Sequence, residues 1–204
     1  MSSKRESVTE FLTTVNDELW KFEETIDFSS LSKACTLILE TEKKNRRLHI
    51  TGIGKPSHVS AYATSLFSSI GIPAYFLDGT EATHGSSGQV VAGDVVIAIS
   101  NSGKTSELLQ TVECLQNNGA KIIALTGNAE SPLAKYSQVC LKAKADYEGD
   151  HLNKPPRASI LIEILSLQIL SILLQEEKQL TAEQYVKWHP GGTIGESIRE
   201  GENA

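Results

Sequence analysis

Residues 94–107 read DVVIAISNSGKTSE, and this stretch decides the fold. Its first part, residues 94–99, is an apolar run rich in β-branched side chains, which is typical of a strand buried on both faces. A polar loop follows at residues 100–106, and the apolar spacing of residues 108–115 predicts a helix after that loop. A buried strand that ends in a polar loop and a helix is the repeating unit of a parallel α/β sheet.

The same unit recurs on both sides of this stretch. We expect further strands at residues 48–51, 73–77, 121–125 and 139–142. We expect helices at residues 8–26, from Ser29 or Ser30 onward, and at residues 59–70, 131–136, 158–175 and 181–187. The prediction is one α/β domain over residues 1–204, a three-layer α/β/α sandwich. It consists of an N-terminal helical pair (1–45), a core with the C-terminal helices (46–196) and a tail (197–204).

Composition excludes several classes of protein. The formal net charge of −6 argues against general nucleic-acid binding, which needs clustered positive charge. Three cysteines without a Cys-x-x-Cys pair predict neither a disulfide framework nor a sulfur-rich metal site. The five histidines show no metal-ligand spacing, so we predict no metal. The N-terminus is polar and Glu163 and Gln168 interrupt the longest apolar stretch, so we expect a cytoplasmic protein that does not enter a membrane.

Ligands of parallel sheets bind beyond the carboxyl ends of the strands. Four loops occupy that position here: residues 52–57, 78–88, 100–106 and 145–156. The third of them opens a helix, where backbone N–H groups and the helix dipole favour an anion. It supplies hydroxyl groups at Ser100, Ser102 and Thr105, more than an ordinary helix cap needs, although a capping cluster stays an alternative.

Two nucleotide motifs are incomplete. Gly103-Lys104-Thr105 resembles the end of a P-loop, but the earlier glycine of that motif would fall at Ala98. Gly52-Ile53-Gly54 begins like a dinucleotide fingerprint, but Ser57 occupies the third glycine position. We therefore predict neither ATP nor NAD, and no cofactor.

Charged residues lie in or near these loops. Lys55 would begin a helix, where its positive charge is unfavourable because the N-terminus of a helix is the positive end of its dipole. A residue in a locally unfavourable position often binds a ligand. Glu107 lies in the first turn of its helix, where the helix dipole stabilises a carboxylate without any ligand, so a structural role is the alternative. Glu148 and His189 are each weak signals alone, because isolated loop residues are usually solvated.

Taken together, the motifs resemble the sugar isomerase (SIS) domain and, within it, the arabinose 5-phosphate isomerases. The matching stretches are GIGKPSHV (52–59), DGTEATHG (78–85), DVVIAISNSGKTSE (94–107), IIALTGNAESPLAK (122–135) and WHPGGTIG (188–195). The resemblance implies a five-stranded flavodoxin-like sheet and a homotetramer whose histidines cross into a neighbour's active site. It implies conversion of D-ribulose 5-phosphate to D-arabinose 5-phosphate and back, which feeds Kdo synthesis.

The resemblance also assigns residues. Its catalytic set falls on Lys55, Glu107, Glu148 and His189. The expected substrate contacts are Gly54, Ser57, His84, Ser100, Asn101, Ser102 and Thr105. The chain departs from longer members, which carry a pair of cystathionine-β-synthase-type domains after the His-Pro-Gly-Gly motif. Lys104, Lys154 and Arg157 add positive charge near the phosphate site, which raises the hypothesis of a second anionic ligand.

An aldose–ketose isomerisation needs a base that moves a proton between C1 and C2 through an enediol. Glu148 is our first candidate for that base and His189 the second, while Lys55 would stabilise the carbonyl oxygen. Other SIS isomerases, for hexulose 6-phosphates or heptose phosphates, remain alternatives, as does a non-catalytic sugar-phosphate sensor. Residues 161–174 are apolar around much of their helix, which suggests a homo-oligomer, with complete burial of the helix within one subunit as the alternative.

Overall fold

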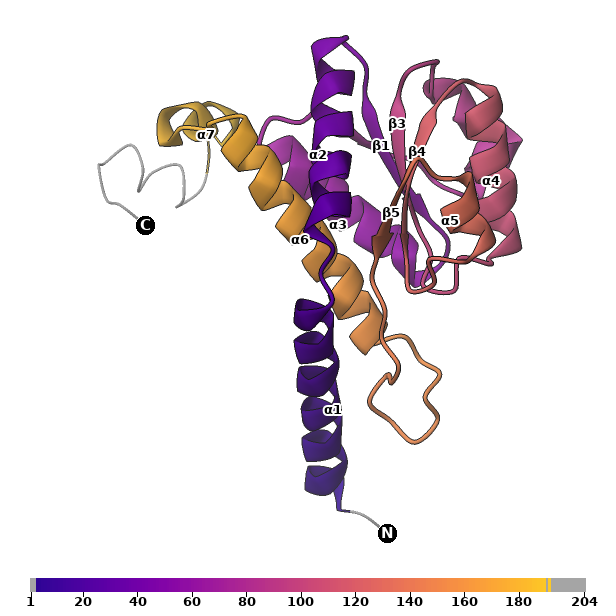
Figure 1. Ribbon diagram of the computed structural model, residues 1–204, viewed down its shortest axis with the longest axis vertical. Helices are drawn as coiled ribbons and strands as arrows, with labels where there is room; N and C mark the ends of the chain where they lie inside the picture. Colours follow the sequence, from indigo (N-terminus) through magenta and orange to yellow (C-terminus); the bar gives the residue numbers. More distant parts are fainter. Residues whose placement is uncertain (1–2, 190, 192–204) are drawn as a thin grey trace.

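A five-stranded parallel sheet organises the computed structural model, which describes residues 3–189 and residue 191 (Figure 1). The strands are β1 (Leu48–Gly52), β2 (Ala74–Phe76), β3 (Val95–Ile99), β4 (Lys121–Thr126) and β5 (Val139–Lys142). Their order is β2-β1-β3-β4-β5, and every neighbouring pair is parallel. All five residues of β1 and of β3 are buried, as expected for strands covered on both faces. The expected flavodoxin-like sheet is therefore confirmed.

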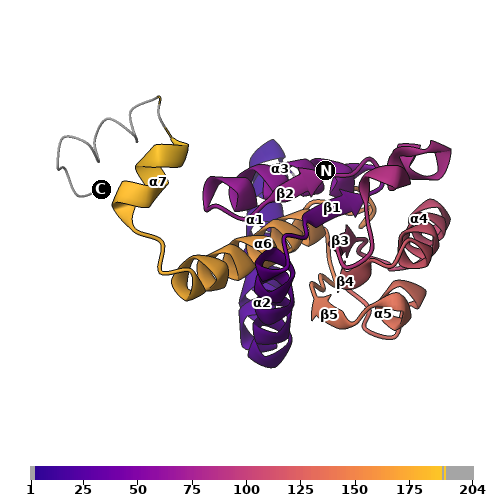
Figure 2. The same ribbon diagram turned by 90° about the horizontal axis from the view of Figure 1, so that it is seen from above.

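Helices cover both faces of this sheet. The α-helices of the described chain are α1 (Lys4–Glu24), α2 (Phe28–Lys43), α3 (Lys55–Ser69), α4 (Ser106–Asn117), α5 (Pro132–Tyr136), α6 (Ala158–Glu177) and α7 (Ala182–Trp188), of which α1 and α7 extend away from the sheet (Figure 1). The view along the layers shows α2, α3 and α6 on one face and α4 and α5 on the other (Figure 2). One apolar cluster fills each side: Phe67 and Ile97 lie in the first, Leu115 and Ile122 in the second. The three-layer prediction is correct.

The start of the second helix differs from the prediction. Asp27, not Ser29 or Ser30, is the N-cap of α2. Its carboxylate accepts hydrogen bonds from the backbone N–H groups of both serines, at 3.0 and 3.2 Å. One carboxylate satisfies two free N–H groups of the first turn and also suits the positive end of the helix dipole, which a serine hydroxyl does less well.

Helix α6 is the central helix of the molecule. By length and composition it could cross a membrane, but it packs against α1, α2 and α3, as the core helix of a soluble domain does. Complete burial within one chain is not reached, because Leu161 and Ile172 are 41% and 54% exposed. Its N-terminus lies beside the loop of residues 145–157 and its C-terminus leads to α7, at the opposite end of the molecule (Figure 1).

Candidate active site

The carboxyl ends of the strands bring the expected loops to one edge of the sheet. β1 and β3 are direct neighbours, paired from Leu48–Val95 to Gly52–Ile99, so their loops begin side by side. The chain leaves β1 towards β2 and leaves β3 towards β4, on the other side. This reversal of direction is the switch point at which open α/β sheets bind ligands.

The loop between β3 and α4 presents unpaired donors. Among the described residues, the backbone N–H groups of Ser102, Thr105 and Ser106 have no hydrogen-bond acceptor. The hydroxyls have partners within the loop: Ser100 Oγ lies 3.1 Å from Thr105 Oγ1, and Ser102 Oγ accepts from the backbone N–H of Lys104 at 3.2 Å. Donors left open at the N-terminus of a 12-residue helix form a site suited to an anion.

Gly103 fixes the shape of this loop. Its φ is +61°, and a Cβ atom there would lie 2.2 Å from Ser131 Oγ. Asn101 makes a second close contact, because a Cβ on Gly127 would lie 2.6 Å from its Oδ1. Asn101 O also accepts from Thr126 Oγ1 at 3.2 Å and Gly127 N at 2.9 Å. Asn101 therefore ties the loop to the end of β4, while Gly103 lets the two loops meet.

Lys55 is the first residue of α3 and is exposed. No described residue offers its ammonium a hydrogen bond or an ion pair. Gly54 is the N-cap of α3 with a φ of +70°, so the turn before Lys55 needs glycine. Ser57 is half-buried in the first turn, and its N–H donates to Gly54 O at 3.1 Å. Lys55 thus stands unpaired in the turn next to the loop between β3 and α4.

Glu107 lies in the first turn of α4 and is exposed. Its own backbone N–H and the hydroxyl of Ser106, 2.9 Å from Oε2, lower the pKa of its carboxyl. The carboxyl is therefore ionised at neutral pH. Its described partner is Ser106, and no ion pair with Lys55 is formed within the described part of this chain.

The loop after β2 holds His84. This segment contains two short 3₁₀ turns, Glu81–His84 and Ser86–Gln89, and His84 is exposed at the end of the first. Thr111 on α4 anchors the loop by donating its hydroxyl to Gly79 O at 2.7 Å. A Cβ on Gly79 would lie 2.7 Å from Ile53 Cδ1, so this loop contacts the β1–α3 turn as well.

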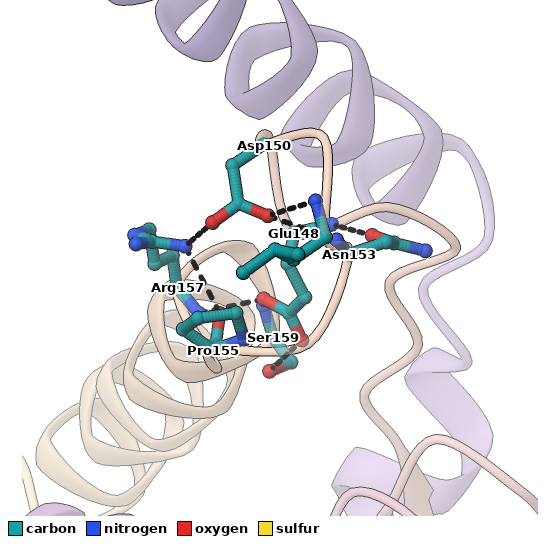
Figure 3. A network of polar contacts seen from close by, with 7 residues as sticks. Glu148, Asp150, Asn153, Pro155, Arg157 and Ser159 are labelled. Carbon is teal, nitrogen blue, oxygen red and sulfur yellow. Dashed lines mark hydrogen bonds and ion pairs between the residues drawn. The ribbon is translucent and has the colours of Figure 1, made fainter.

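Glu148 is held at the N-terminus of α6 (Figure 3). Its Oε2 accepts from Arg157 N at 2.6 Å and Ser159 N at 3.2 Å, while its Oε1 accepts from Ser159 Oγ at 2.6 Å. Its own N–H donates to Asn153 Oδ1 at 2.6 Å. The side chain is only 9% exposed. Oε1, with a single donor, keeps a lone pair that can take a proton.

The extra positive charge of this loop has a local partner. Arg157 Nη1 forms an ion pair with Asp150, which Figure 3 draws above Glu148. Desolvation raises the pKa of Asp150, but the ion pair with Arg157 and the N–H groups of Asn153 and Leu152 together outweigh it, so the pKa is lowered. Lys154 is exposed. Because a carboxylate engages Arg157, the geometry gives no support to a second anionic ligand at this place.

His189 lies apart from the other expected catalytic residues. It follows α7, while Glu148 precedes α6, whose 20 residues span about 30 Å. Its ring stacks on Tyr185, with centroids 3.9 Å apart, and Nδ1 lies 2.9 Å from Tyr185 O. Because that oxygen can only accept, Nδ1 carries the proton and Nε2 keeps its lone pair in the neutral ring. Residues 190 and 192–195 of the WHPGGTIG motif lie outside the described residues.

The indole of Trp188 packs against Gly71 and so positions the C-terminal end of α7. A Cβ on Gly71, in the turn between α3 and β2, would lie 2.1 Å from the indole. Within one chain, Lys55, Glu107 and Glu148 therefore lie in the segments that follow the carboxyl ends of β1, β3 and β5, whereas His189 follows α7, beyond the C-terminal end of α6. Figure 1 shows the two ends of α6 far apart.

Sequence reasoning missed two residues near Glu148. Ser159 is fully buried and contacts both oxygens of its carboxylate, and Glu163 is fully buried one turn further along α6. The signal for Glu163 was its place inside an apolar run, where an acid has no ordinary reason to stand. Among the described residues, no group of three or more His, Cys, Asp or Glu side chains could hold a metal ion.

Known proteins resemble this chain. The SIS domain model matches residues 42–168. Arabinose 5-phosphate isomerase KdsD from Pseudomonas aeruginosa is 37% identical over 166 residues, 81% of this chain and 50% of the relative. KdsD from Francisella tularensis is 34% identical over 198 residues, 97% of this chain and 60% of the relative. The chain thus spans about half to three-fifths of these two relatives.

A solved structure adds a ligand to this comparison. The c3406 protein of Escherichia coli CFT073, in complex with arabinose 5-phosphate, superposes with a TM-score of 0.80 and 27% identity. The match covers 91% of this chain and 95% of that protein. The fold comparison and the family model therefore point to the same family. This chain therefore belongs to the SIS domain family.

Proposed function

We propose that this chain is an aldose–ketose isomerase that interconverts D-ribulose 5-phosphate and D-arabinose 5-phosphate through an enediol. The observation that carries the proposal is the pairing of two loops at the β1/β3 switch point. One offers the unpaired N–H groups of Ser102, Thr105 and Ser106 to an anion, and the other offers the unpaired ammonium of Lys55. The names of the relatives and the sugar-phosphate complex of c3406 support the choice of sugar.

The phosphate would bind at the N-terminus of α4. There the free N–H groups would donate to the phosphate, and the hydroxyls of Ser100, Ser102 and Thr105 would turn to it from the partners that they have within the loop. Asn101, held against β4, keeps the loop in place. This binding energy is remote from the bond that changes, so it positions the sugar rather than reacting with it.

Glu148 would move the proton between C1 and C2. Its Oε1 keeps a lone pair, and the turn of α6 that holds the carboxylate fixes its direction. The base takes a proton from one carbon and returns it to the next, while a hydroxyl proton passes between the two oxygens. The net reaction is an isomerisation in which no proton or electron is gained or lost.

Lys55 would stabilise the negative charge that develops on the carbonyl oxygen. Its unpaired ammonium suits that task, because no carboxylate of the described chain competes for it. Glu107, ionised beside Ser106, would orient a sugar hydroxyl or Lys55 itself. Gly54, Ser57 and His84 line the same edge of the sheet and complete the expected substrate contacts.

His189 would act in the site of a second copy of the chain. It cannot reach Glu148 of its own chain across the length of α6, and its free Nε2 is suited to shuttling hydroxyl protons. The exposed Leu161 and Ile172 on α6 offer apolar surface for such an assembly. We therefore propose a homo-oligomer, a tetramer, in the cytoplasm, whose product feeds Kdo synthesis.

The decisive experiment offers the purified chain a panel of ketose phosphates with five, six and seven carbons. Formation of arabinose 5-phosphate from ribulose 5-phosphate, at a rate well above that of the other sugars, is the expected result. Faster turnover of a hexulose 6-phosphate or a heptose phosphate would assign a different SIS isomerase. Tight binding of a sugar phosphate without turnover of any would point to a sensor.

A further inference from the structure

Glu163 is a buried carboxyl group that the proposed mechanism does not use. Its side chain has no exposed surface, and among the described residues neither Oε1 nor Oε2 has a hydrogen-bond partner. Buried polar groups are normally paired, and an unpaired buried charge is costly. An unpaired carboxyl group inside the core therefore calls for a structural or functional explanation.

The position of Glu163 supplies one. It lies four residues after Ser159 on α6, so the two side chains share one face of the helix, a single turn apart. Ser159 is the residue whose hydroxyl and N–H hold Glu148. Burial and, second, the negative charge of Glu148 raise the pKa of Glu163 to about 8. Glu163 is therefore a neutral acid at pH 7, next to an anion.

No other charge in the described part of the chain relieves this pair. Lys55 and His58, in the first turn of α3, are exposed at the surface. Glu18 on α1 is buried, but it accepts from Lys21 Nζ at 2.7 Å and from Asp146 N at 2.6 Å. The charge that acts on Glu163 comes from Glu148. Two carboxyl groups in one interior region thus hold one negative charge between them.

We propose that Glu163 is a positioning residue for Glu148. As a neutral acid it leaves the Glu148 carboxylate hydrogen-bonded to Ser159, and when ionised it repels that carboxylate and weakens these hydrogen bonds. The role in turnover rests on the proposed function, in which Glu148 is the base. The coupling between the two carboxyl groups does not.

Stability measurements test the coupling without any substrate. Between about pH 4.5, where a free glutamate titrates, and about pH 8, the folded chain keeps a proton on Glu163 that the unfolded chain has released. The contribution of Glu163 to the free energy of unfolding of wild type therefore falls as pH rises through this window and becomes constant above it. Glu163→Gln removes the effect, so the Tm of this variant minus that of wild type should increase from pH 5 to pH 8 and then stay constant.

Glu148 provides the second half of the test. In a Glu148→Gln background, adding Glu163→Gln should give a Tm gain that levels off at a lower pH, because one of the two causes of the raised pKa is gone. Glu113→Gln, at an exposed site on α4, is the matched control and should show no such dependence. Glu163→Leu replaces Glu163→Gln if the amide does not fold. A pH-independent gain, or a plateau that Glu148→Gln leaves in place, would overturn the proposal.

The pH profile of kcat tests the positioning role. With ribulose 5-phosphate, Glu163→Gln should match wild type near pH 7 within about fivefold and keep its activity at pH 9, where wild type declines. Identical alkaline limbs in the two proteins would overturn the positioning role. Absence of turnover in wild type would overturn the proposed function alone, and the stability measurements would still decide the coupling.

Discussion

The hydroxyl of Ser159 donates to Glu148 Oε1 at 2.6 Å, and the backbone N–H of the same residue donates to Oε2 at 3.2 Å. One buried serine thus contacts both oxygens of the carboxylate at the N-terminus of α6. The carboxylate serves the helix as a cap, because it accepts from N–H groups of the first turn, and in the proposed function it is also the base. Both uses depend on the same charge.

Replacing that charge tests the assignment of the base. Glu148→Gln should lower kcat by about 10²–10⁴-fold, because an amide cannot collect the carbon-bound proton. Asp150→Asn is the matched control in the same loop: it removes the ion pair with Arg157, while the amide oxygen can still accept from the N–H groups of Leu152 and Asn153, and kcat should stay within about fivefold of wild type. Steady-state kinetics with ribulose 5-phosphate decide. A Glu148→Gln enzyme that retains most of its turnover would show that another group is the base.

Ser102 tests the phosphate site. Ser102→Ala removes a hydroxyl that would bond to a dianion, and such a bond is worth about 1.5–3 kcal/mol, so KM should rise about 10–100-fold. Since the phosphate is remote from the reacting carbons, kcat should change little. Ser29→Ala, an exposed serine on α2, should leave both constants unaltered. A drop in kcat at constant KM would place Ser102 at the reacting end of the sugar instead.

Gly103 tests the packing of the two loops. Gly103→Ala places a Cβ 2.2 Å from Ser131 Oγ at a φ of +61°. The conformation alone costs about 1–2 kcal/mol, so Tm should fall by about 4 °C or more and phosphate affinity should weaken. Gly88→Ala is the control, because a Cβ there meets no atom within 4 Å. Thermal unfolding measures both; equal Tm values for the two variants would mean that the β3–α4 loop adjusts freely.

Trp188 tests whether the placement of His189 matters. Trp188→Ala removes the indole that fills the space over Gly71 and frees the end of α7. If His189 acts in a neighbouring subunit, kcat should fall about 10–100-fold with only a small change in Tm. Lys187→Ala, on the same helix and paired only with the exposed Glu183, is the control. Unchanged kcat in Trp188→Ala would argue against a catalytic role for this end of the chain.

Local patterns were sufficient to predict the sheet. The β-branched run of residues 95–99 and the polar loop after it predict a buried strand and an anion site, since neither depends on distant parts of the chain. The cap of α2 was mispredicted because serine and aspartate are both good caps, and local sequence does not decide between neighbours.

Contacts between distant segments could not be predicted in this way. Ser159 donates to Glu148 only because the loop of residues 149–157 folds back and places Glu148 at the start of α6. The sequence predicts a helix between Glu148 and His189, but only the structure shows the stacking of His189 on Tyr185 and the place of Trp188 over Gly71 at the far end of that helix. Such relations follow from the path of the chain in space.

Helix α6 sets the spacing between the segment that holds Glu148 and the segment that holds His189, and this limits how its length can change. Inserting one residue would rotate everything beyond it by about 100° and advance it by about 1.5 Å. The indole of Trp188 would then leave the recess over Gly71, although every residue around Glu148 would stay in place. Deletions and insertions are therefore expected to be far less tolerated in this helix than in the loop that precedes it.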